Sequence, residues 1–238
     1  MAQRSSIVAW LQLLRLPNAF TAAADVAMGY AVTQFYPEWS RELGMLIVAS
    51  CMLYLSGMVL NDVFDAEDDK RDRPDRPIPS GRISLKSAAA IGWGLLAGGI
   101  VVAWSLSLQA NDWRPGAVAT LLAACIILYD GALKRTRLAP FIMGECRFLN
   151  VLLGMSLLIV PWGEGELLIA LGIGVYIMGV TIFARTDARV SSRTRLTVGL
   201  IILLAGIVLL AAVPTLSGDR PSLEFHGYGL FLVLGYIV

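Results

Sequence analysis

The sequence is poor in charge, histidine and cysteine, and each shortage argues against a class of protein or a kind of site. Only 16% of the 238 residues are charged, against about 25% in an average soluble domain. A single histidine, His226, argues against a histidine-based metal centre or general base. The three cysteines all fall in apolar stretches, so no disulfide framework is indicated. There is no glycine-rich nucleotide loop, and we expect no nucleic-acid partner.

Apolar residues are what the sequence has in excess. They make up 57% of the chain, and the mean hydropathy is +0.69. A spanning helix needs roughly 20 mostly apolar residues. Runs of this kind predict transmembrane helices at 17–36, 42–61, 84–110, 114–133, 138–160, 164–184 and 195–216. We therefore expect an all-α, polytopic helical bundle that forms one membrane-embedded domain over residues 1–238.

The two ends of the chain differ from these spans. Residues 6–15 lack a small-residue cleavage site and carry Gln12 and Arg15 among apolar residues, so they indicate an interfacial amphipathic helix rather than a signal peptide. An eighth apolar run begins near Phe225 and stops at Val238. It is too short to span, so we expect the domain to be incomplete at its C-terminus.

Positive charge gathers on one side of the predicted bundle. Of 19 Lys and Arg residues, most lie at the N-terminus or in the loops after the second, fourth and sixth spans. The positive-inside rule places that side in the cytoplasm. The longest of these loops, residues 61–86, is dense in charge and proline. Since long ordered loops usually have a function, we expect the active site on the cytoplasmic side.

An acidic cluster follows directly on the second apolar run. If the helix continues, Asp62, Asp65 and Asp69 share one face, and Asn61 lies beside it. Clustered carboxylates repel one another and need a compensating cation. Oxygen ligands without His or Cys suit Mg²⁺, which prefers one or two carboxylates together with waters and substrate phosphates. A solvated loop, in which the aspartates pair with nearby Lys and Arg, remains the alternative.

This segment, NDVFDAEDDKRDRPDRPIPSGRIS, resembles the first signature of the UbiA superfamily of intramembrane prenyltransferases. The resemblance implies a bundle that transfers a prenyl group from a prenyl diphosphate to an aromatic or lipid acceptor, with Mg²⁺ as cofactor and membrane lipid around it. It implies catalytic roles for Asp62, Asp65 and Asp69. It also implies metal binding by these three and Asn61, and contacts to substrate from Asn61, Arg73 and Arg76.

Two further segments resemble the same family. YDGALKR at the end of the fourth span matches a Tyr followed by a Lys-Arg pair, which implies that Tyr129, Lys134 and Arg135 bind substrate. Arg15 and Asn18 match the family's first-helix signature and are expected to face the substrate. Lys134 and Arg135 could instead be charged anchors without a ligand. The segment also mimics the CDP-alcohol phosphotransferase spacing, but Phe148 and Leu152 stand where that motif needs aspartates, so we reject this reading.

The family's second acidic motif is incomplete here. TIFARTD, residues 181–187, aligns with it in register, which implies a catalytic and metal-binding role for Asp187. The second carboxylate position holds Ser191, and Phe183 replaces the usual Tyr. Arg185 adds a charge that we expect to contact substrate phosphate. These departures resemble a divergent branch of the superfamily encoded in ebo gene clusters. They keep open a non-catalytic protein of the same fold that binds or moves a polyprenyl lipid, and a small-molecule transporter is a weaker alternative.

Charged groups inside apolar spans are costly, about 2.5–3.5 kcal/mol or more at mid-membrane, and usually face a partner or a cavity. Asp25 and Arg147 lie at similar depths in the first and fifth spans, roughly 12–14 Å from the cytoplasmic end. We predict that they pair or line one cavity. Arg147 and Asn150 share a helix face and are expected to orient the acceptor or the diphosphate; a purely structural pair is the alternative.

Overall fold

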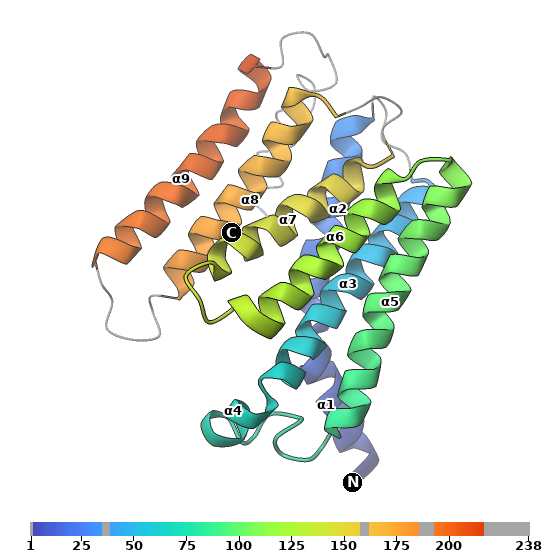
Figure 1. Ribbon diagram of the computed structural model, residues 1–238, viewed down its shortest axis with the longest axis vertical. Coiled ribbons are helices and arrows are strands. Elements are labelled where there is room, and N and C mark those ends of the chain that lie inside the picture. The colour runs from blue at the N-terminus through green and yellow to red at the C-terminus, as the bar shows by residue number, and fades with distance from the viewer. Residues whose placement is uncertain (1, 35–38, 158–161, 186–192, 217–238) are drawn as a thin grey trace.

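The computed structural model describes residues 2–34, 39–157, 162–185 and 193–216, and these residues form helices and their connections (Figure 1). Beyond a short 3₁₀ turn at Leu16–Asn18 and a π turn at Tyr129–Leu133, the α-helices take the following bounds: α1 Ala2–Leu14, α2 Ala19–Thr33, α3 Arg41–Phe64, α4 Ala66–Asp72, α5 Leu85–Ala110, α6 Arg114–Leu128, α7 Ala139–Met155, α8 Glu164–Ala184 and α9 Arg193–Leu216.

Each of the seven predicted spans coincides with a helix. Five of them, α3, α5, α6 with its π turn, α8 and α9, are long and apolar enough to cross a membrane. The other two, α2 with 15 residues and α7 with 17, are shorter than the predicted runs. The all-α, multi-pass membrane architecture is therefore confirmed. The apolar run that begins near Phe225 lies outside the described residues.

Glycines allow α2 and α7 to pack backbone against backbone. A Cβ atom on Gly29 would lie 2.3 Å from the carbonyl oxygen of Val151, and one on Gly154 would lie 2.2 Å from that of Val26. Neither separation is sterically possible, so both positions require glycine. This close approach fixes the two helices that carry Asp25 and Arg147.

The amphipathic N-terminal helix is present as α1. Ala9 and Leu13 are buried in a small apolar cluster with Val59 on α3 and Ile78 in the loop after α4. On the other face, Ile7 remains 63% exposed. The packing holds the end of α1 against the end of α3, which places Arg15 beside the acidic segment.

The acidic segment is not one continuous helix. α3 ends at Phe64, and Asp65 joins it to the short helix α4. The loop that follows turns at Gly81, whose φ of +74° lies in the left-handed region that favours glycine. In Figure 1, α1, α4 and the adjoining ends of α3 and α6 lie together at one end of the bundle, called the α4 end below.

Candidate active site

One face of α3 carries polar groups along half its length. Ser50, Tyr54 and Asp62 on α3, with Met58 between them and Asp65 just past the helix end, recur at intervals of three or four residues, so they form a single stripe. The stripe begins inside the bundle and ends at the charged α4 end. Two hollows lie along it, and each uses a different part of the stripe.

Two buried carboxylates meet at one guanidinium. Arg76 Nη1 lies 2.6 Å from Asp69 Oδ2 and 3.3 Å from Asp62 Oδ1. Arg15 Nη2 approaches the same Asp62 oxygen at 3.0 Å. Arg15 adopts a left-handed backbone conformation, φ 48° and ψ 45°, which is costly for a non-glycine residue. Such strain is found mostly where surrounding structure and function require it.

Asp65 faces a second pair of cations. Lys134 Nζ lies 2.8 Å and Arg135 Nη2 2.9 Å from Asp65 Oδ1. Arg135 also bonds Asp68 on α4. The hydrogen bonds from Arg135 and then Arg71 lower the pKa of the Asp68 carboxyl. Lys134 and Arg135, which follow the fourth predicted span, thus lie at the acidic segment.

An arginine-rich cleft of about 550 Å³ opens at the α4 end. Four guanidiniums line it against three carboxylates, together with glutamine and proline residues: Gln12, Arg15, Asp62, Asp72, Arg73, Pro74, Asp75, Arg76, Pro77 and Arg82. Arg82 links the loop to α1 by donating to the Gln12 side chain at 3.0 Å. Guanidiniums bind phosphate oxygens in fork geometry, so this cleft is suited to a polyanion.

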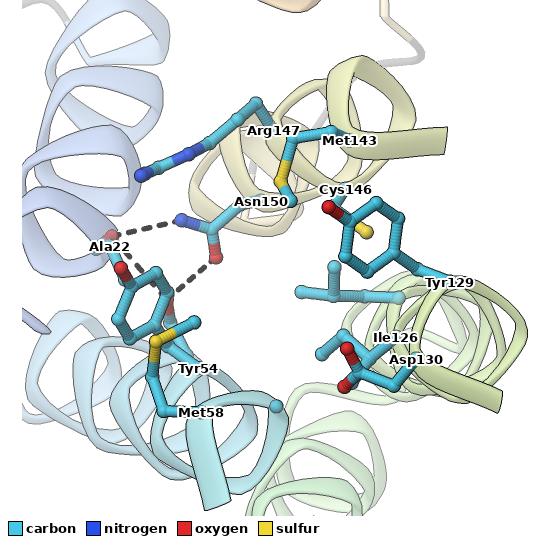
Figure 2. A pocket seen from close by; sticks show the side chains of 13 residues that line it. Ala22, Tyr54, Met58, Ile126, Tyr129, Asp130, Met143, Cys146, Arg147 and Asn150 are labelled. Carbon is cyan, nitrogen blue, oxygen red and sulfur yellow. Dashed lines mark hydrogen bonds between the residues drawn. The ribbon is translucent and has the colours of Figure 1, made fainter. Parts of the chain in front are cut away.

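The second hollow is a cavity of about 160 Å³ within the bundle (Figure 2). Its walls come from α2, α3, α6 with its π turn, and α7. Apolar side chains such as Met58, Leu122 and Ile126 supply most of the lining, and Tyr54 and Tyr129 face one another across it. Arg15 separates the two hollows, because it touches Met58 in the cavity wall and Asp62 in the cleft.

The predicted pairing of Asp25 with Arg147 is confirmed. Arg147 Nη1 lies 2.7 Å from Asp25 Oδ2, and its Nη2 donates to the Thr21 hydroxyl at 2.9 Å. Asn150 donates to Asp25 Oδ2 at 3.2 Å. Figure 2 shows the Arg147 guanidinium turned toward α2 rather than into the hollow, while its charge also lies over the Tyr54 ring at 5.6 Å.

Residues 22–237 match the UbiA prenyltransferase family. The chain belongs to the UbiA prenyltransferase family. A solved UbiA homologue from Archaeoglobus fulgidus, bound to GPP and Mg²⁺, shares the fold with a TM-score of 0.74 at 15% identity, covering 96% of this chain and 84% of that chain.

Two curated relatives in the UbiA family have a named activity. They are the digeranylgeranylglyceryl phosphate synthases of Metallosphaera sedula, 32% identical over 127 residues, and of Saccharolobus solfataricus, 34% identical over 134 residues. The matches cover 53% and 55% of this chain. This chain spans less than half of either relative, 43% and 45% respectively.

Other predicted UbiA residues lie apart from these hollows. Asn18 is exposed and lines neither the cavity nor the cleft. Arg185 donates to the backbone carbonyls of Lys134 and Thr136, so it holds the loop after the π turn rather than facing either hollow. Asp187, expected to be catalytic and to bind metal, lies outside the described residues.

The donor set at the α4 end fits a magnesium ion. Across the described ranges, no three His, Cys, Asp or Glu side chains converge on one point. Two carboxylates do: the oxygens of Asp62 and Asp69 are close enough to share one cationic nitrogen of Arg76. Mg²⁺ needs only one or two carboxylates when water and phosphate complete its octahedron. Asp65 is directed to Lys134 and Arg135 instead.

Sequence reasoning missed one polar pair. Asp130 is buried in the cavity wall, and the side-chain amide of Asn61 donates to its Oδ1 at 2.8 Å. Asn61 was expected to bind metal, but its amide nitrogen is directed to Asp130. The sequence did carry one sign of this pair, a carboxylate at the end of the fourth apolar run. The family motif drew attention to its neighbours Tyr129 and Lys134 instead.

Proposed function

We propose that this protein transfers a prenyl group from a prenyl diphosphate to a lipid acceptor, with Mg²⁺ as cofactor. The observation that carries the proposal is the junction at Arg15, where an arginine-rich cleft adjoins an apolar cavity, with the carboxylates of Asp62 and Asp69 sharing Arg76 at the cleft wall. A prenyl diphosphate has the same two parts, a polyanion joined to a hydrocarbon. The positive-inside charge bias supports placing this end of the bundle in the cytoplasm.

The diphosphate binds in the cleft, held by Arg15, Arg73 and Arg76. Lys134 and Arg135 add positive charge beside Asp65. Charge develops on the diphosphate as its bond to C1 breaks, and donors already aimed at it lower that barrier. The reacting end of the prenyl chain lies in the cavity, where Tyr54 and Tyr129 present aromatic faces that can stabilise a cation.

Asp62 and Asp69 would hold the magnesium ion, whose chemistry is to neutralise charge on the diphosphate oxygens. The catalytic and metal-binding role of Asp187 stays a prediction, and so does metal binding by Asn61. The mostly apolar lining of the cavity disfavours water beside the reactive carbon, which protects this carbon from hydrolysis.

The relatives' name supports a glyceryl phosphate lipid as the acceptor. A digeranylgeranylglyceryl phosphate carries two prenyl groups on one glyceryl phosphate, so its synthase joins a prenyl group to a lipid of that kind. An aromatic acceptor, the other class that the sequence resemblance implied, requires a ring to fit beside Tyr54 and Tyr129. A non-catalytic lipid-binding protein remains the second candidate, because the second acidic motif is incomplete.

The test uses purified protein in lipid nanodiscs. Radiolabelled geranylgeranyl diphosphate is supplied with geranylgeranylglyceryl phosphate or an aromatic acid, with and without Mg²⁺. We expect a prenylated glyceryl phosphate lipid only with Mg²⁺. Asp62→Asn and Asp69→Asn should each lower turnover at least about 100-fold. Glu42→Gln, an exposed change at the opposite end of α3, should have no effect. Binding without turnover would favour the non-catalytic candidate.

A further inference from the structure

Alkylation of an acceptor hydroxyl releases a proton, and some group has to accept it. As the C1–oxygen bond to diphosphate breaks, its electron pair leaves with the diphosphate. The acceptor oxygen forms the new bond to C1 and must lose its hydrogen. The departing diphosphate or a side chain can take that proton, and a side chain that acts as general base lies within hydrogen-bond reach of the hydroxyl.

Four carboxylates near the two hollows form ion pairs with arginine or lysine side chains. Asp62 and Asp69 are paired with arginines, Asp65 with Lys134 and Arg135, and Asp25 with Arg147. An ion-paired carboxylate is a poor proton acceptor, because the neighbouring cation favours its charged form. Each of these four groups is therefore better suited to holding charge than to accepting a proton.

Asp130 differs from all of them. In the described part of the chain it makes no ion pair within 4.0 Å, and a neutral amide, that of Asn61, holds its Oδ1. Its side chain is buried, yet it lines the apolar cavity rather than the cleft. Figure 2 shows the carboxylate pointing from the end of α6 across the hollow toward α3.

The second carboxylate oxygen, Oδ2, has no hydrogen-bond partner among the described residues and faces Gly57 on α3. A Cβ atom built on Gly57 would lie 4.0 Å from this oxygen, an ordinary contact distance, so only a residue without a side chain leaves room beside it. The backbone around Asp130 is a π turn, closed by the Lys134 amide donating to the Tyr129 carbonyl at 2.8 Å. π turns are rare and occur frequently at functional sites. This one turns Asp130 inward while Lys134, four residues on, reaches Asp65.

Resting on the function proposed above, we propose that Asp130 is the catalytic residue that binds the hydroxyl group of the acceptor and takes its proton. The hydroxyl donates a hydrogen bond to Oδ2, and its proton passes to that oxygen as the bond to C1 forms. Asn61 is the positioning residue, since its amide fixes Oδ1 and leaves Oδ2 turned to the cavity. The acceptor class is therefore an alcohol.

Asp130→Asn tests this assignment, because asparagine keeps the shape and can still accept from Asn61. We expect turnover of the alcohol acceptor to fall at least about 100-fold. Affinity for a non-reactive prenyl thiodiphosphate should stay within about twofold, since the general-base role leaves donor binding intact. Glu42→Gln is the matched carboxylate-to-amide control.

A second variant keeps the test decisive should Asp130→Asn not fold. Asn61→Ala removes the amide that orients Asp130, and we expect turnover to fall about tenfold, the size of one charge-assisted hydrogen bond, with the Mg²⁺ concentration for half-maximal activity unchanged. A shift in that concentration would make Asn61 a metal ligand and overturn its assigned role.

Three results would overturn the proposal. Turnover of Asp130→Asn near the wild-type rate would show that Asp130 is not the general base. Loss of donor affinity together with turnover would assign Asp130 to the diphosphate instead. Wild-type protein that releases diphosphate from no prenyl donor would refute the proposed function itself, and the assignment of Asp130 with it. Active wild-type protein with an unimpaired Asp130→Asn variant refutes the assignment alone.

Discussion

Removing one member of the pair formed by Asp25 and Arg147 should destabilise the bundle strongly. The side chains are only 4% and 18% exposed, and Asp25 has Asn150 as its second hydrogen-bond donor. Arg147→Met leaves a buried carboxylate without its cation, and Asp25→Leu leaves a buried guanidinium. Breaking a buried pair in this way costs about 3–5 kcal/mol.

The double variant separates a structural role from a role in binding. Replacing both charges by apolar groups removes the unpaired charge, so most of the lost stability should return. The coupling free energy between the two positions should then be about 3 kcal/mol. Unfolding of wild-type, single and double variants in mixed micelles, followed by circular dichroism, measures it.

Activity of the double variant decides the interpretation of Arg147. Since its guanidinium is turned toward Asp25 and Thr21, we expect the double variant to keep prenyl transfer within about tenfold of wild type. Additive losses of stability would refute the reasoning. A stable double variant with no turnover would show that Arg147 binds substrate, as the sequence analysis expected from its shared helix face with Asn150.

Three further changes follow from single features. Gly154→Ala would place a methyl group 2.2 Å from the Val26 carbonyl; it should cost about 1–3 kcal/mol by overpacking, seen as a lower unfolding midpoint. Gly81→Ala should cost about 1–2 kcal/mol, because φ +74° is strained for alanine. Asp68 has a lowered pKa, so its link to Arg135 should stabilise the protein above pH 3.8 and disappear as pH falls through the lowered value. The stability difference between wild type and Asp68→Asn should therefore be constant from pH 5 to 8 and vanish in stronger acid.

Helical periodicity made much of this architecture predictable. Apolar runs located the spans because a bilayer demands length and hydrophobicity together. The pairing of Asp25 with Arg147 followed from equal rise along two helices that start at the same end of the bundle. The same reasoning placed Asp62, Asp65 and Asp69 on one face only if the helix continued through them, and the structure has a break there. The break at Asp65 directs Asp65 to Lys134, while Asp62 and Asp69 share Arg76.

Contacts between distant helices were harder to foresee. The bond from Asn61 to Asp130 depends on a π turn, which shifts the face that α6 presents. The periodicity of apolar residues in a sequence does not show where a helical turn contains one extra residue. The partners of Arg185, the backbone carbonyls of Lys134 and Thr136, likewise depend on where the end of α8 meets the loop after the π turn. The charge of Arg185 was visible in the sequence, but its partners were not.

The most direct measurement is an anomalous-scattering map of crystals grown with Mn²⁺ and a non-reactive prenyl thiodiphosphate. We expect a metal peak at Asp62 and Asp69, with the diphosphate in the arginine-rich cleft and the prenyl carbon C1 in the cavity between Tyr54 and Asp130. A metal and diphosphate bound away from this end of the bundle would contradict it.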